Sequence, residues 1–248
     1  MKAVLLALLT TSLASLGAED FATLVKRGDA LDAKFKTKEA LAVYLEAEKL
    51  QPADAELLHR IAKQYGESML DVSGKAEKKA LGEKSLEYSK RAVAADPKNA
   101  TAHLALAVSY GRVATYMDNK TKIAYSKLVK EQVDQSIALD PRNDLAWHVL
   151  GAWQYELANL NGVLRAVAGI VYGTLPSASN EDAVKAFKKA IELNPRRVAN
   201  HVELGRTYLA MGNKSDAKAE LEKGLSLPDQ QRDDPDVKQR AREALKKV

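Results

Sequence analysis

Apolar positions along the chain recur with the spacing of amphipathic helices, and five of these helical stretches stop at a proline. Proline cannot continue a helix interior, and it restricts the residue before it. Each site therefore marks the end of one helix and the start of another. The five stops are Leu50-Gln51-Pro52, Ala95-Asp96-Pro97, Leu139-Asp140-Pro141, Leu193-Asn194-Pro195 and Ser226-Leu227-Pro228. Their similarity indicates an internal repeat.

Two helix patterns alternate within this repeat. The helix before a proline has small, large and small residues on one face, and the helix upstream carries its own apolar signature. The first pattern occurs at Ala40/Tyr44/Ala47, Ala183/Phe187/Ala190 and Ala217/Leu221/Gly224. The second occurs at Leu58/Ile61/Ala62/Tyr65, His103/Leu106/Ala107/Tyr110, Trp147/Leu150/Gly151/Gln154 and His201/Leu204/Gly205/Tyr208. Both resemble the tetratricopeptide (TPR) pattern, a helix-turn-helix of about 34 residues.

We therefore predict an all-α fold, a right-handed TPR-like α-solenoid of about five antiparallel helix pairs with a C-terminal capping helix. Residues 19–248 are expected to form a single domain. The predicted units cover about 21–54, 55–99, 100–143, 144–197 and 198–230, with the capping helix at 235–248.

The spacing of the prolines shows where the repeat is extended. Successive prolines are 45, 44, 54 and 33 residues apart, so only the last interval is close to the period. In the second and third units we expect both helices to be lengthened, with turns near Ser73-Gly74 and Asp118-Asn119. The fourth unit instead contains an insertion at 159–180.

This insertion is the most unusual stretch of the chain. Between Val163 and Tyr172 the only charged residue is Arg165, and the run is too short to cross a bilayer, which takes about 20 residues. We expect its apolar side chains to be buried against protein or ligand. The segment Pro176-Ser177-Ala178-Ser179-Asn180 then supplies a turn and an N-cap, with Glu181 and Asp182 in the first turn of the next helix.

The N-terminal residues have the layout of a signal peptide. Lys2 precedes an apolar run, and small residues lead to Ala18 before the acidic Glu19. We predict that residues 1–18 are removed and that the protein is exported to the periplasm or secreted. No transmembrane segment is expected in the mature chain.

Composition narrows the possible chemistry. The chain has no cysteine, which excludes disulfides and cysteine-based metal sites or nucleophiles. Its net charge of +5 comes from basic and acidic residues that alternate, so we expect no nucleic-acid partner. The four histidines fall at matching places in different repeats, and metal ligands must converge to about 2 Å from one ion. We expect no metal and no cofactor.

No catalytic motif is present. Ser73-Gly74-Lys75 lacks the upstream glycine of a phosphate-binding loop, and no His-Glu-x-x-His occurs. We predict that the protein is not an enzyme. A deep pocket that brings His148, Tyr155 and Arg165 together would favour an enzymatic function instead.

What remains is the concave surface that stacked helix pairs form. By analogy with TPR proteins, this groove should be apolar at its centre, although its side chains could equally serve packing between repeats. The candidate groove residues are His59, Lys63, Glu67, Leu104, Val108, Arg112, His148, Ala152, Tyr155 and Arg206.

The C-terminal hundred residues also resemble one family. The matching motifs are Trp147-His148-x2-Gly151-x-Trp153-x-Tyr155, Gly173-Thr174-x-Pro176-Ser177-x-Ser179-x-Glu181-Asp182-Ala183 and Leu204-Gly205-x-Thr207-Tyr208. They resemble the regulator of microtubule dynamics family. The resemblance implies a TPR protein whose animal relatives associate with microtubules and mitochondria, one of them binding lipid through its repeats. The predicted signal peptide departs from that animal pattern.

Two functions fit these observations. The first is a non-enzymatic scaffold that binds a protein or peptide partner in its groove. The second is a carrier or sensor of a lipid-like apolar ligand, held against Leu104, Val108 and His148 under a lid. The candidate lid residues are Leu164, Val167, Ile170 and Tyr172. A carrier needs a void beneath the insertion, whereas a structural plug would leave none.

Overall fold

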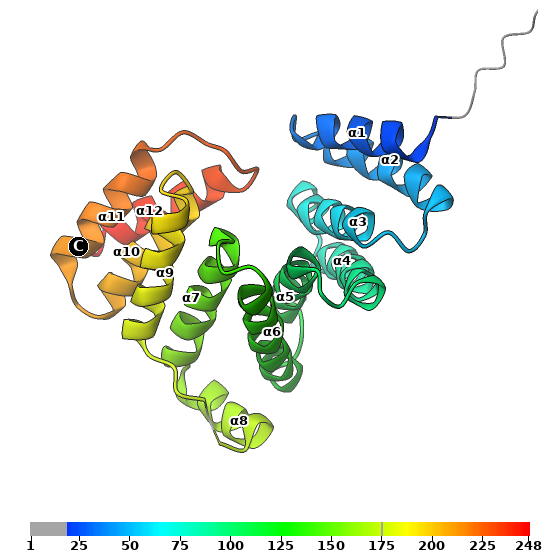
Figure 1. Cartoon of the computed structure of the whole chain (residues 1–248). Helices are drawn as coiled ribbons and strands as arrows, with labels where there is room; N and C mark the ends of the chain where they lie inside the picture. The colour runs from blue at the N-terminus through cyan, green and yellow to red at the C-terminus, as the bar shows by residue number, and fades with distance from the viewer. Residues whose placement is uncertain (1–18, 175) are drawn as a thin grey trace, which may run out of the picture.

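A computed structural model describes residues 19–174 and 176–248, and the described chain is helical, with no strand (Figure 1). The predicted signal peptide at 1–18 lies outside the described residues. The helices are α1 (Phe21–Asp32), α2 (Thr37–Leu50), α3 (Ala55–Ser68), the 3-10 turn η1 (Met69–Asp71), α4 (Lys75–Ala95), α5 (Ala100–Ala114), α6 (Asn119–Leu139), α7 (Asp144–Ala158), α8 (Gly162–Tyr172), α9 (Asn180–Leu193), α10 (Val198–Ala210), α11 (Lys214–Ser226) and α12 (Asp234–Leu245).

The helices pack as five successive pairs. The most extensive contacts lie within α1/α2, α3/α4, α5/α6, α7/α9 and α10/α11, and α12 packs on the last pair. The prediction of an all-α, TPR-like solenoid with a capping helix is confirmed. None of the described helices is long and apolar enough to cross a membrane.

The proline stops set the helix ends. The second helix of each pair ends two residues before its proline, at Leu50, Ala95, Leu139, Leu193 and Ser226. At the start of α9 the predicted capping segment 176–180 supplies Ser179 as the N-cap, because its Oγ accepts the backbone N–H of Asp182 at 3.0 Å.

The predicted packing face is buried. Tyr44 of α2 and Phe187 of α9 are almost fully buried, as are the small residues on either side of each. The facing helices approach closely because they present glycine: a methyl group on Gly28 would overlap the Tyr44 ring, and one on Gly151 would lie 2.8 Å from Phe187.

The same contact, from a ring nitrogen to a proline carbonyl oxygen, recurs at three repeat junctions. The Nε2 atom of His103 lies 2.9 Å from the carbonyl oxygen of Pro97, and Nε2 of His201 lies 3.0 Å from that of Pro195. Trp147 occupies the equivalent position and donates from Nε1 to the carbonyl of Pro141 at 2.9 Å. The repeat position therefore explains these two histidines structurally.

The extra residues of the second and third units lie mainly in one helix of each pair. The turns are at the predicted places, but α4 and α6 have 21 residues each, whereas α3 and α5 have 14 and 15. The expectation that both helices lengthen is therefore wrong. The second helix takes up most of the insertion, apart from the short 3-10 turn after α3.

The insertion of the fourth unit forms α8, which projects from the array and packs on α6 (Figure 1). Tyr172 anchors its end by donating to Ser126 Oγ at 3.2 Å. The expectation that its apolar side chains are buried is wrong for Val163 and Ile170, which are 67% and 81% exposed. A single helix lying on one neighbour can cover only one of its own faces.

Candidate functional site

A cavity of about 700 Å³ opens between α5, α6, α7 and the first residues of the insertion. The first helices of these two pairs, α5 and α7, touch only marginally. Its walls are mainly apolar. They include Val108, Ile123, Val149, Ala152, Leu157 and Leu164.

Arg112 is the most unusual polar group on this cavity. Its guanidinium lies over Gly66, and within the described residues its side chain makes no hydrogen bond or ion pair. Burial lowers the pKa of Arg112, while the charges of Glu67 and Asp233 oppose that change. A guanidinium in this position can donate to an anionic or carbonyl group of a ligand.

His148 forms part of the opposite wall. Its Nδ1 lies 2.9 Å from Oδ1 of Asn200, and its ring meets Phe187 edge-on with the centroids 5.5 Å apart. Burial lowers the pKa of His148, which favours the neutral ring at physiological pH. His148 therefore presents a polar, uncharged ring to the cavity, and its Nδ1 atom is already hydrogen-bonded to Asn200.

The cavity gathers five of the residues predicted from the sequence. These are Val108, Arg112, His148, Ala152 and Leu164. A pocket that brings His148, Tyr155 and Arg165 together, as expected for an enzyme, is not found here. Only His148 of these three residues lines the cavity. Arg165 instead donates to the carbonyl of Ala158 at 3.3 Å, at the end of α7.

The other predicted residues lie elsewhere. Leu104 is 5% exposed and belongs to the core around α5 and α6, so it is a packing residue. Tyr155 and Arg206 interact with each other, with the guanidinium carbon 5.5 Å from the ring centroid. Of the candidate lid, only Leu164 borders the cavity; Val167, Ile170 and Tyr172 do not.

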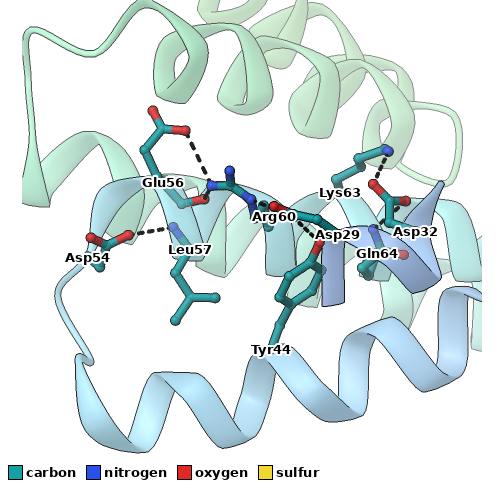
Figure 2. A network of polar contacts seen from close by, with 9 residues as sticks. All are labelled: Asp29, Asp32, Tyr44, Asp54, Glu56, Leu57, Arg60, Lys63 and Gln64. Atoms are coloured by element: carbon teal, nitrogen blue, oxygen red, sulfur yellow. Dashed lines mark hydrogen bonds and ion pairs between the residues drawn. The ribbon is translucent and has the colours of Figure 1, made fainter. Parts of the chain in front are cut away.

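Lys63 belongs to a polar network between the first two pairs, and His59 lies one turn earlier on the same helix, α3 (Figure 2). Lys63 Nζ and Gln64 Nε2 both donate to the Asp32 carboxylate, at 2.6 and 2.9 Å. Burial lowers the pKa of His59 to about 4, so this side chain is neutral. At this end of the array the helix surfaces predicted to face the groove are used for packing between repeats.

The same network joins three helices through one carboxylate. Tyr44 Oη and Arg60 Nε both donate to Asp29 Oδ1, at 2.7 and 2.9 Å (Figure 2). α1, α2 and α3 are thereby tied together.

Sequence reasoning missed the contribution of α6 to the cavity. Ser126 lies on its wall and accepts from Trp153 Nε1, whose distance to the Ser126 carbonyl oxygen is 2.9 Å. The TPR analogy assigns the groove to the first helix of each pair, so it gives no signal for the second. Among the described residues, no group of three or more His, Asp or Glu is arranged to hold a metal ion.

Comparison with known proteins identifies relatives over nearly the whole chain. The family described as "Regulator of microtubule dynamics protein 1-3" matches residues 24–248. Regulator of microtubule dynamics protein 1 of Bos taurus is 32% identical over 85% of this chain and 66% of its own length. The protein of the same description from Pongo abelii is 31% identical over 96% of this chain and 81% of its own length.

Solved structures show the same architecture. A thermophilic TPR protein of Thermus thermophilus superposes with a TM-score of 0.64 over 91% of this chain and 98% of its own, at 21% identity. At that identity the likeness concerns the fold alone.

Proposed function

The chain belongs to the regulator of microtubule dynamics family, and from this premise we propose that it is a non-enzymatic scaffold that binds a segment of a protein partner. The apolar cavity between α5 and α7 carries this proposal. It would receive an apolar side chain of the partner, as the central pockets of protein interfaces do.

The composition of the cavity supports an anchor of this kind. Apolar walls supply the free energy of burial, and the polar groups at Arg112, Lys122 and Glu156 can fix the orientation of a bound segment. The apolar walls are open to water, and covering apolar surface is favourable. Occupation by a partner would cover this surface.

Filling the cavity tests the proposal. Ala152→Trp places an indole in the cavity, and Ala80→Trp on the exposed surface of α4 is the matched control. Each purified chain is used as bait in an extract of its own cells, and bound proteins are quantified by mass spectrometry. We expect specific partners to be lost with Ala152→Trp and kept with Ala80→Trp. Identical partner sets for both variants would contradict the proposal.

A carrier of an apolar ligand is the second candidate function. The volume of about 700 Å³ is that of a small-molecule site, and Leu164 brings the start of the insertion to its edge. Arg112 would hold a polar or anionic end of such a ligand while the apolar part lies against Val108 and Ala152. The exposed outer face of α8 plays no part in this arrangement.

Native mass spectrometry separates the two candidates. The full chain purified without detergent should carry extra mass if it holds a ligand, and Ala152→Trp should remove that mass. A ligand-free wild-type chain would count against the carrier and leave the protein scaffold as the proposal.

A further inference from the structure

The loop between α11 and α12, residues 227–233, reaches the other end of the array; we refer to it as the strap. Arg232 makes the contact, and Figure 1 shows this loop turned towards the first helices. Arg232 Nη1 donates to Thr37 Oγ1 at 2.9 Å and to the carbonyl oxygen of Glu67 at 3.1 Å. Its Nη2 pairs with the carboxylate of Asp71. One guanidinium therefore joins the last loop to α2, α3 and η1.

The acceptors form a site that fits a guanidinium. Thr37 begins α2 and Asp71 ends η1, so a hydroxyl, a backbone carbonyl and a carboxylate converge from three elements. The Arg232 and Asp71 side chains are 21% and 24% exposed, which protects the pair from full solvent screening. Arginine suits this geometry because its planar fork donates in several fixed directions.

Buried acceptor atoms remain unused nearby. Oε2 of Glu67 and Oε1 of Gln64 are buried and have no hydrogen-bond partner among the residues that the structure describes. Gln64 itself is fully buried, and its Nε2 is engaged by Asp32. Buried acceptors without partners are costly.

The strap is held to α2 and α3 by hydrogen bonds from Arg232 alone among the described residues. Its other hydrogen bonds are to α12: Lys238 donates to the Leu227 carbonyl at 2.6 Å, and Asp234 Oδ2 accepts from the backbone of Gln230 and Gln231. The strap therefore resembles a short tethered ligand. It is anchored to α12 and inserts one side chain, Arg232, among α2, α3 and η1.

We infer that Thr37, Glu67 and Asp71 form an arginine-binding site for an extended segment of a partner protein, and that Arg232 occupies this site as an internal competitor. This site is separate from the apolar cavity and does not depend on the function proposed for it. A partner's arginine replaces that of the strap and makes the same three contacts.

The covalent link between the strap and the site determines how strongly Arg232 competes with an external peptide. A segment linked in the same chain acts at an effective concentration in the millimolar range, so an external peptide binds only in the fraction of molecules whose site is free. Removing Arg232 should therefore tighten the binding of an arginine peptide by roughly 10-fold.

A peptide with the sequence of residues 226–236, which contains one arginine, is the probe. Its fluorescence anisotropy is titrated with the wild-type chain and with the full chain carrying Arg232→Ala. We expect saturable binding to the variant and about 10-fold weaker binding to the wild type. A control peptide with alanine at the arginine position should not bind, and adding Asp71→Asn to Arg232→Ala should abolish binding.

A second measurement leaves Arg232 in place. The chain has no cysteine, so Gln230→Cys carries a single spin label on the strap. The arginine peptide should increase the mobility of this label, whereas the alanine peptide should not. The proposal is overturned if folded Arg232→Ala protein does not bind the arginine peptide, or if saturating peptide leaves the labelled strap unchanged. Arg232 would then be only a structural contact between the two ends of the array.

Discussion

The first two helix pairs and the middle of the array are built from the same repeat, but the first is closed by polar contacts and the second contains an apolar cavity. In α1–α4 the helix surfaces carry a polar network around Asp29 and Asp32, and Tyr44 fills the space between helices. Between α5 and α7 the corresponding surfaces separate and leave an apolar cavity. Whether a repeat position packs or stays open thus depends on the side chains between the first helices, which are long and polar where α3 faces α1.

The two regions differ where the sequence departs from the repeat period. The cavity is bounded by the long helix α6 and by the start of the insertion at Asn159, Leu160 and Asn161. The first pair has neither feature, and its helices have only 12 and 14 residues. A long second helix alone does not create this volume, because α4 has the same 21 residues as α6; the start of the insertion is the feature that accompanies the cavity.

Removing the ring of Tyr44 should give the largest effect. Tyr44 is 0% exposed, so Tyr44→Ala should lower the free energy of unfolding by about 3 to 5 kcal/mol. Hydrogen exchange should show lost protection in α1–α4 before α10 and α11. Tyr44→Phe, which loses only the bond to Asp29, should cost about 2 kcal/mol. An equal loss of protection along the whole array would show that the first pairs are not a distinct unit.

A matched pair of glycine substitutions measures the difference in packing directly. Gly28→Ala drives a methyl group into the Tyr44 ring and should cost about 3 kcal/mol. Gly111→Ala, on the cavity wall of α5, meets no atom within 4 Å and should stabilise by up to about 1 kcal/mol through helix propensity. Urea denaturation of both variants checks this. Similar costs at the two sites would mean that the cavity wall is as tightly packed as the first pair.

Acid should weaken the first pairs through His59. Burial lowers its pKa to about 4, below the ordinary value of 6.5, so the unfolded chain binds the proton more tightly than the folded one. The stability due to the neutral ring is present above pH 6.5 and is lost as pH falls towards 4. At pH 5 the loss should be about 2 kcal/mol. His59→Gln should show a correspondingly smaller drop in unfolding free energy between pH 7 and pH 5; an equal drop would assign the acid sensitivity to other groups.

The features that could be predicted from the sequence are those that depend on neighbouring residues within one helix or turn. Proline marked the end of the second helix in each pair, and the spacing of small and large residues identified Tyr44 and Phe187 as buried. The cavity was predictable only in part, because Val108 and Ala152 follow the repeat whereas Ser126 on α6 does not. The contact from Arg232 to Thr37 joins residues 195 positions apart and depends on the curvature of the whole array, which no local pattern specifies.

The smallest effect should come from the outer face of α8. Ile170 is 81% exposed and contributes little buried area, so Ile170→Ser should change the unfolding free energy by less than about 0.5 kcal/mol. Ala168, two residues earlier on the same helix, is fully buried, and Ala168→Asp should detach α8 by burying an unpaired charge. Hydrogen exchange of α8 amides distinguishes the two variants. If Ile170→Ser destabilised the chain as much as Ala168→Asp, the outer face of α8 would be covered in solution, contrary to its exposure in the structure.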